Sequence, residues 1–259
     1  ATSFTGSQIT VNTTSGAGVS IAGNSGAVTF NNTGNGLDIL TTVGAGLSAS
    51  SSGTLTIQGG GNSISTTTGT AVNVTNTTIG AAGLNFVSVS SNGAANGIVL
   101  NNTGSTGSLT VTGSGTTAGS GGTLANITGN AVDVQGGTVN LGYMLIQNPG
   151  GYGLYGINLL GSNSFSNGTI TGFDSGGVNG DNGISFVNTG TNAGSLAVTN
   201  STISSGSTGN DGIFMEAQGS GAMTLTVNGS TFTGLYGDGV QVNGITGATS
   251  VMRVTIQNS

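Results

Sequence analysis

Apolar and polar residues alternate along this chain in short runs of four or five, and small residues precede most of the runs. The run from Gly183 to Phe186 has the form small, apolar, polar, apolar (Gly-Ile-Ser-Phe). Successive side chains of a β-strand point to opposite faces, so Ile184 and Phe186 share one face and Ser185 takes the other. Each run therefore predicts a short strand with one apolar face, which it can bury only against other strands.

The same unit recurs along the whole chain. Ten copies begin at Gly18, Gly36, Thr54, Ala71, Gly97, Ala131, Gly156, Gly183, Gly212 and Gly239. The intervals between successive starting positions are 18, 18, 17, 26, 34, 25, 27, 29 and 27. A second family of strands begins at Val198 and returns at Val227 and Ile256, with the same interval of 29 both times. These spacings predict a compact repeat over about residues 1–80 and the same repeat with longer loops over about residues 81–259.

A repeat of short strands predicts a solenoid, in which each turn stacks on the previous one and the apolar faces join into one core. We therefore expect an all-β fold: a single-stranded parallel β-helix of about ten coils, continuous over residues 1–259, with no significant α-helix. No segment has a 3.6-residue period, and Gly, Ser, Thr and Asn are poor helix formers. A β-sandwich or propeller is the alternative, but it would need clearer hairpin signals and longer strands.

The ten starts resemble those of right-handed parallel β-helix proteins, the pectate-lyase-like solenoids. They are most similar to Gly/Asn/Ser/Thr-rich β-strand-repeat segments of large bacterial surface and autotransporter-like proteins. The resemblance covers the whole chain and implies a right-handed coil, because a left-handed β-helix normally keeps a strict coil length. Enzymes, phage tailspikes, adhesins and inert stalks share this coil, so the resemblance implies an architecture rather than an activity.

Composition narrows the classes of function. The 259 residues include 53 Gly, a single base (Arg253), no His and no Cys, and the net charge is −6. Phosphate binding needs clustered Lys and Arg, so nucleic acid and anionic lipid are disfavoured as partners. No apolar run reaches the length of about 18 residues that a membrane-spanning helix needs, which argues against membrane insertion in that form. Low charge and a Gly/Ser/Thr/Asn-rich surface are typical of secreted bacterial surface proteins, and the start at Ala1 indicates a processed or excised part of a longer chain.

The residue before each strand is Asn or Asp in six of the ten copies. Both residue types accept left-handed backbone angles and hydrogen-bond their own turn, so the first interpretation is a stacked corner. The alternative concerns Asp181, Asp211 and Asp238, which fall at or beside this position in the last three copies. Stacked carboxylates could bind Ca²⁺, which prefers several oxygen ligands. We expect no other cofactor.

No residue is assigned a catalytic role. The β-helix polysaccharide lyases that this chain resembles use an Arg or Lys base beside acidic Ca²⁺ ligands, and Arg253 has no acidic cluster near it in sequence. A pair of carboxylates can hydrolyse a glycoside, but the offsets among Asp181, Asp211, Glu216 and Asp238 identify no pair. The absence of His excludes Ser–His catalysis, and without His or Cys zinc is disfavoured.

Aromatic residues gather in one part of the chain, at Tyr143, Tyr152, Tyr155, Phe165 and Phe173. Large apolar side chains are usually core, so the first interpretation is a thicker core in this region. The alternative is a patch that binds a sugar or a protein partner.

We therefore expect a non-enzymatic structural solenoid, extracellular or on a prokaryotic cell surface, that forms a stiff stalk or fibre and presents an adhesive surface. Open solenoid ends are unpaired strand edges that invite pairing. The expected partners are thus flanking repeats of a longer chain or further copies stacked head to tail. The alternative is a carbohydrate-binding or carbohydrate-cleaving β-helix of a surface protein, with surface glycans as partners.

Overall fold

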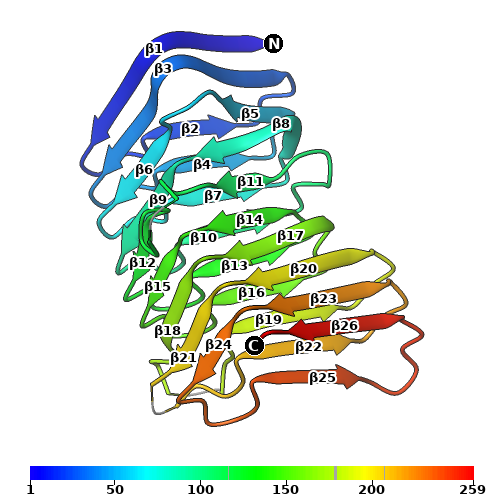
Figure 1. Ribbon diagram of the computed structural model, residues 1–259. Coiled ribbons are helices and arrows are strands. Elements are labelled where there is room, and N and C mark those ends of the chain that lie inside the picture. The colour runs from blue at the N-terminus through cyan, green and yellow to red at the C-terminus, as the bar shows by residue number, and fades with distance from the viewer. Residues whose placement is uncertain (116, 178–179, 207) are drawn as a thin grey trace.

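The computed structural model describes residues 1–115, 117–177, 180–206 and 208–259 as a parallel β-solenoid of about nine turns (Figure 1). The turns stack from the blue N-terminal end to the red C-terminal end of the ribbon. No helix occurs among the described residues. This confirms the predicted all-β parallel β-helix, with about nine turns instead of ten; the right-handed coil stays a prediction.

Each turn passes through three faces in a constant order, and strands pair in parallel with those one turn away. We number the faces 1, 2 and 3 in the order in which the chain visits them. Two long strands, β1 (Thr2–Thr13) and β3 (Ala27–Thr41), bend across the corner between faces 1 and 2 and contribute to both.

The remaining strands each belong to one face. Face 1 continues with β5 (Thr54–Gln58), β8 (Thr78–Phe86), β11 (Leu109–Val111), β14 (Val139–Gly142), β17 (Gly161–Ser166), β20 (Gly194–Thr199), β23 (Met223–Asn228) and β26 (Met252–Gln257). Face 2 continues with β6 (Ser63–Thr66), β9 (Ser88–Asn92), β12 (Thr123–Ala125), β15 (Leu145–Gln147), β18 (Thr169–Phe173), β21 (Thr202–Ser205) and β24 (Thr231–Thr233). Face 3 consists of β2 (Val19–Ala22), β4 (Leu47–Ser50), β7 (Val72–Thr75), β10 (Ile98–Asn101), β13 (Val132–Gln135), β16 (Leu154–Ile157), β19 (Ile184–Asn188), β22 (Ile213–Ala217) and β25 (Val240–Gly244).

The coil of the N-terminal part is longer than the predicted interval of 18. On face 3, Val19 pairs with Leu47 and Leu47 pairs with Val72, so the residue number rises by 28 and then by 25. The predicted starts at Gly36 and Thr54 lie in β3 and β5, outside face 3. The spacing of 18 therefore joined strands of different faces, and the compact repeat over about residues 1–80 is wrong.

Two further differences concern face 3 itself. The ten starts omit β4, although Gly46 to Ala49 has the same form of small, apolar, polar, apolar. On β16 the start at Gly156 is displaced by three residues from the true start at Gly153, because Leu154 and Gly156 pair with Ile184 and Phe186. The displaced start placed Ile157 in the core, whereas it is only half-buried.

The small residue before each face 3 strand has a steric cause. A Cβ atom added to Gly183 would lie 2.5 Å from Ile203 Cγ2 and 2.7 Å from the carbonyl oxygen of Gly212, one turn further on. Real Cβ atoms essentially never approach so closely. The corner that leads into face 3 thus packs against the next turn here, and this contact explains the glycine at position 183.

The core consists of columns of inward side chains that run along the solenoid axis. On face 1 one column joins Phe30, Ile57, Leu84 and Leu109, each 5% exposed or less. Burying one such side chain stabilises the fold by roughly 1.5–3 kcal/mol. Since every inner turn contributes to the columns, one apolar core continues through the stack.

Candidate functional site

Polar side chains form a column at the corner between faces 2 and 3. The Asn96 Oδ1 atom accepts the backbone N–H of Asn130 at 3.1 Å, one turn further on. Asn182 Oδ1 accepts the backbone N–H of Asp211 at 2.9 Å, and Asp211 Oδ1 accepts that of Asp238 at 2.7 Å. We call these five residues the corner column. The predicted Asn/Asp position is thus a stacked corner, held by bonds between turns.

Asp211 performs in this column the task that Asn performs elsewhere. Its side chain is buried, and burial raises the pKa of its carboxyl group. The hydrogen bond from the Asp238 backbone opposes that shift, and the negative charge of Asp238 adds to it. One carboxylate oxygen of Asp211 is therefore already engaged in joining two turns.

Asp181 directly precedes Asn182 of the corner column in the sequence, and its side chain lies beside Tyr152. Burial raises the pKa of Asp181, the interaction with the Tyr152 hydroxyl lowers it, and the nearby Asp174 carboxylate raises it again. The pKa of Tyr152 is raised strongly, first by burial and then by the charge of Asp181. Each of these two side chains therefore influences the pKa of the other.

Asp174 is the least satisfied acid. Its side chain is 2% exposed, and its Oδ1 atom has no hydrogen-bond partner. Its backbone is left-handed, with φ of 58°. A buried carboxylate without a partner destabilises the fold, and a nearby acid such as Asp181 increases the cost.

The acids do not assemble a dense cation site. Among the described residues, no group of three or more Asp, Glu, His or Cys side chains is placed to hold a metal ion. Ca²⁺ usually takes six to eight oxygen ligands. Of the three residues considered for Ca²⁺, Asp211 and Asp238 are joined in the corner column, while Asp181 interacts with Tyr152.

Glu216 and Arg253 lie on different faces of the solenoid. Glu216 belongs to β22 on face 3 and accepts hydrogen bonds from the side chains of Gln218 and Asn243. Arg253 belongs to β26 on face 1. Glu216 and Arg253 are therefore separated, whereas the β-helix polysaccharide lyases place an Arg or Lys base beside acidic residues.

The five aromatic residues divide between core and surface. Phe165 and Phe173 are fully buried, as the core interpretation predicts. Tyr152 and Tyr155 are half-buried and stack on each other, with ring centroids 4.7 Å apart and planes 23° apart. Tyr143 occupies a left-handed position with φ of 56°.

The stacked tyrosines lie on the outer side of face 3. Tyr155 pairs with Asp133 on one side and with Ser185 on the other, and Ser185 in turn pairs with Phe214. The charge of Asp133 contributes to raising the pKa of Tyr155, after the larger effect of burial. We call Tyr152, Tyr155 and Phe214 the aromatic patch; carboxylates of Asp133 and Asp181 adjoin it.

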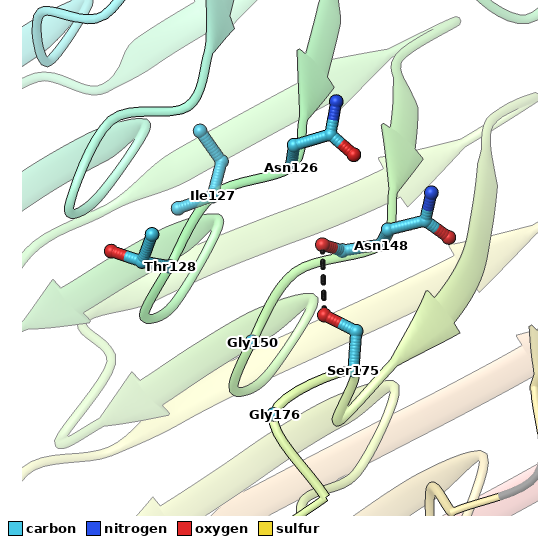
Figure 2. A pocket seen from close by; sticks show the side chains of 7 residues that line it. All are labelled: Asn126, Ile127, Thr128, Asn148, Gly150, Ser175 and Gly176. Atoms are coloured by element: carbon cyan, nitrogen blue, oxygen red, sulfur yellow. Dashed lines mark hydrogen bonds between the residues drawn. The ribbon is translucent and has the colours of Figure 1, made fainter.

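A shallow depression of about 450 Å³ lies on corner loops of three successive turns (Figure 2). It is lined by Asn126, Ile127, Thr128, Asn148, Gly150, Ser175 and Gly176. The Ser175 hydroxyl donates to the carbonyl oxygen of Asn148 at 3.1 Å, as Figure 2 shows. The lining contains no ionisable side chain, so the depression offers hydrogen bonds and shape but no acid–base chemistry.

Sequence reasoning identified Tyr152, Tyr155 and Asp181 as candidates but did not connect Asp133 or Asp174 with them. The outward position of Asp133 could have been recognised from the sequence, because Asp133 is the polar residue of an alternating strand. Asp174 carried none, since it lies in a loop outside the repeat.

No protein-family model, curated protein or solved structure matches the chain. Within the described residues, no helix has the length and apolar character needed to cross a membrane. The functional argument therefore rests on the solenoid and its surface.

Proposed function

We propose that this chain is a non-enzymatic structural solenoid of an extracellular or cell-surface protein of a prokaryote, which serves as a stiff stalk or fibre and presents a surface for adhesion. The observation that carries the proposal is the face 1 ladder, which starts at Phe4 and continues through every turn to Val254. Its expected partners are flanking repeats or further copies of the chain.

The mechanism is mechanical. Each inner strand is paired on both edges, so it offers no free edge to another chain or to a protease. Stability in such repeats is approximately the sum of the stabilities of the turns and of their interfaces. Removing one inner turn breaks strand pairs on three faces together with a section of the apolar core, so the rod resists local opening.

Force spectroscopy tests this role. A molecule held by its two ends should extend in discrete steps as single turns detach. A turn of about 27 residues releases at most roughly 90–97 Å of extended chain. Smooth extension at low force would contradict a load-bearing rod. A reducing-sugar assay over a panel of polysaccharides tests the non-enzymatic part of the proposal. Release of reducing sugar would contradict it.

The aromatic patch supports a second candidate, binding of surface glycans. Tyr rings combine an apolar face with a polar tip, which suits the mixed surface of a sugar ring. The carboxylates of Asp133 and Asp181 adjoin the stacked Tyr152 and Tyr155 and can accept hydrogen bonds from sugar hydroxyls. Tyr155→Ala should abolish binding on a glycan array, whereas the matched variant Tyr236→Ala, at an 84% exposed tyrosine, should retain it. Equal binding by both variants would exclude the patch.

A further inference from the structure

Three of the chain's seven acidic residues gather around the stacked tyrosines of face 3. Asp133 points outward from β13 and pairs with Tyr155. Burial raises the pKa of Tyr152 most, and the charges of Asp181 and Asp174 raise it further, so both acids lie close to this ring. One pair of aromatic rings is therefore surrounded by three carboxylates.

No basic side chain balances these carboxylates. Arg253 is the only Lys or Arg residue of the chain, and it lies in β26 on face 1. Asp174 and Asp181 are both buried, and the Oδ1 atom of Asp174 has no hydrogen-bond partner. Salt screens buried charges much less than exposed ones, so the surface above these two acids keeps a negative potential.

Asp133 is the acid of this group that a ligand can reach. It is half-buried, and its two oxygen atoms accept hydrogen bonds from Asn130 Nδ2 at 3.0 Å and from Gln135 Nε2 at 3.1 Å. Each oxygen of a carboxylate can accept a second hydrogen bond. The Asp133 carboxylate is thus fixed in position and still has acceptor capacity.

Further acceptor oxygens converge beside Gly151, the residue before Tyr152. A Cβ atom added to Gly151 would lie 2.6 Å from Asn130 Oδ1 and 3.4 Å from Asp181 Oδ2. Asn130 Oδ1 also accepts the backbone N–H of Tyr152 at 3.3 Å. The stacked tyrosines are therefore flanked by charged and neutral acceptors from the neighbouring turns on both sides.

This arrangement favours a ligand that combines positive charge with a broad ring. An ammonium group has three donors and no acceptor, so it suits a surface that offers acceptors, and the face of a Tyr ring attracts it as well. A neutral sugar would gain the stacking but not the charge. A lysine side chain would gain the charge but offers only a narrow alkyl stem to the two rings.

We propose that the aromatic patch binds an amino sugar with a free, protonated amine, such as glucosamine. The sugar ring lies on Tyr152 and Tyr155, and the ammonium group donates to Asp133. Phe214 lies two strands from Tyr155, about 9.6 Å away, and extends the surface for the next sugar of an oligomer. This inference rests on the glycan-binding candidate of the proposed function, because it names the class of ligand for the same patch.

Calorimetric titration with glucosamine trisaccharide and with its N-acetylated counterpart tests the requirement for charge. The two ligands share the ring and the linkage, and only the first carries ammonium groups. At neutral pH and low salt the free amino sugar should bind at least about tenfold more tightly, which is the size of one hydrogen bond between charged groups. Added salt should narrow the difference, because the Asp133 carboxylate is partly exposed.

Asp133→Asn and Asp38→Asn are a matched pair of variants. Both acids are half-buried and accept hydrogen bonds from two side chains, but Asp38 lies in β3 on face 2. Since both variants have the same net charge, the general attraction of this acidic chain for a cation falls equally. Asp133→Asn should reduce the preference for the free amine to within about threefold, while Asp38→Asn should keep it. An unchanged preference in Asp133→Asn would overturn the proposal.

The ring signals of tyrosine in NMR spectra provide a readout that needs no substitution. The chain contains four Tyr and no Trp. Signals of Tyr152 and Tyr155 should shift when glucosamine trisaccharide is added, whereas those of the highly exposed Tyr236 should not. Binding that leaves the signals of Tyr152 and Tyr155 unchanged would overturn the assignment to this patch.

The remaining outcomes separate this inference from the proposed function. Equal affinity for the N-acetylated trisaccharide would overturn the requirement for charge and leave the glycan-binding candidate intact. Equal affinity for trilysine would overturn the amino sugar in favour of a basic protein partner. If neither trisaccharide binds, this inference and the glycan-binding candidate both fail, while stepwise extension under force would still support the rod.

Discussion

The Oδ1 atom of Asp211 accepts a hydrogen bond of 2.7 Å from the backbone N–H of Asp238, one turn further along the solenoid. This bond converts an acid that could serve catalysis into a link between turns. It also means that the side chain must accept a hydrogen bond but need not carry charge.

Asp211→Asn should therefore preserve the fold, whereas Asp211→Ala should lower the free energy of unfolding by about 1–3 kcal/mol, because the alanine leaves the Asp238 N–H without its partner and the cost of an unsatisfied buried donor has this size. Urea denaturation of the three proteins measures the difference. Equal losses in both variants would show that the charge, not the acceptor, matters.

The pH dependence of stability follows from the same burial. Burial raises the pKa of Asp211 and of Asp181 above the ordinary value of 3.8. A carboxyl group whose pKa is higher in the folded state binds protons more tightly there, so its stabilising contribution is complete below the unfolded-state pKa and is lost as the pH rises through the folded-state pKa.

The melting temperature should accordingly be higher near pH 3.8, where this contribution is largely present, than at neutral pH, where it is lost. Asp211→Asn with Asp181→Asn should reduce this dependence, because the double variant no longer titrates at these positions. Calorimetry from acidic to neutral pH measures both curves. A wild-type melting temperature that rises steadily toward neutral pH would contradict the assignment.

Asp174→Asn should stabilise the protein at neutral pH. The substitution removes a buried charge whose Oδ1 atom lacks a partner, and Asn tolerates the left-handed backbone that Asp174 adopts. Asp133→Asn is the matched control, because the Asp133 carboxylate accepts hydrogen bonds from Asn130 and Gln135. We expect a higher melting temperature for the first variant and no gain for the second; a loss of stability at position 174 would indicate an unrecognised partner of that carboxylate.

The alternation of residues predicted the strands of the solenoid but not the faces to which they belong. Alternation is a local property of a strand, so Gly-Leu-Asp-Ile at Gly36 and Gly-Val-Ser-Ile at Gly18 have the same form on different faces. The face depends on how many corners lie between two strands, and corners of Gly, Ser and Asn have little periodicity. The true intervals of 28 and 25 along face 3 were therefore missed in favour of an interval of 18.

Only those residues of the candidate site that occupy an equivalent position in successive repeats could be predicted from the sequence. Asn182 and Asp211 occupy the same repeat position, and their role as stacked acceptors could be inferred from turn chemistry. The stacking of Tyr152 on Tyr155 brings together a corner residue and an outward strand residue, which no local pattern relates. The burial of Asp174 depends on packing between turns, so its sequence neighbours carry no sign of it.

The columns predict a gradient of mutational cost along the solenoid axis. Ile57 is fully buried in the face 1 column, whereas Val254 lies in β26 on the same face, opposite Leu225, and is 37% exposed. Ile57→Ala should lower the free energy of unfolding by about 2–5 kcal/mol, the usual cost of a large-to-small change in a core. Val254→Ala should cost less than about 1 kcal/mol in the monomer, because little apolar area is lost and no closed cavity forms. Urea denaturation measures both values, and equal costs would contradict the difference in burial between the two positions.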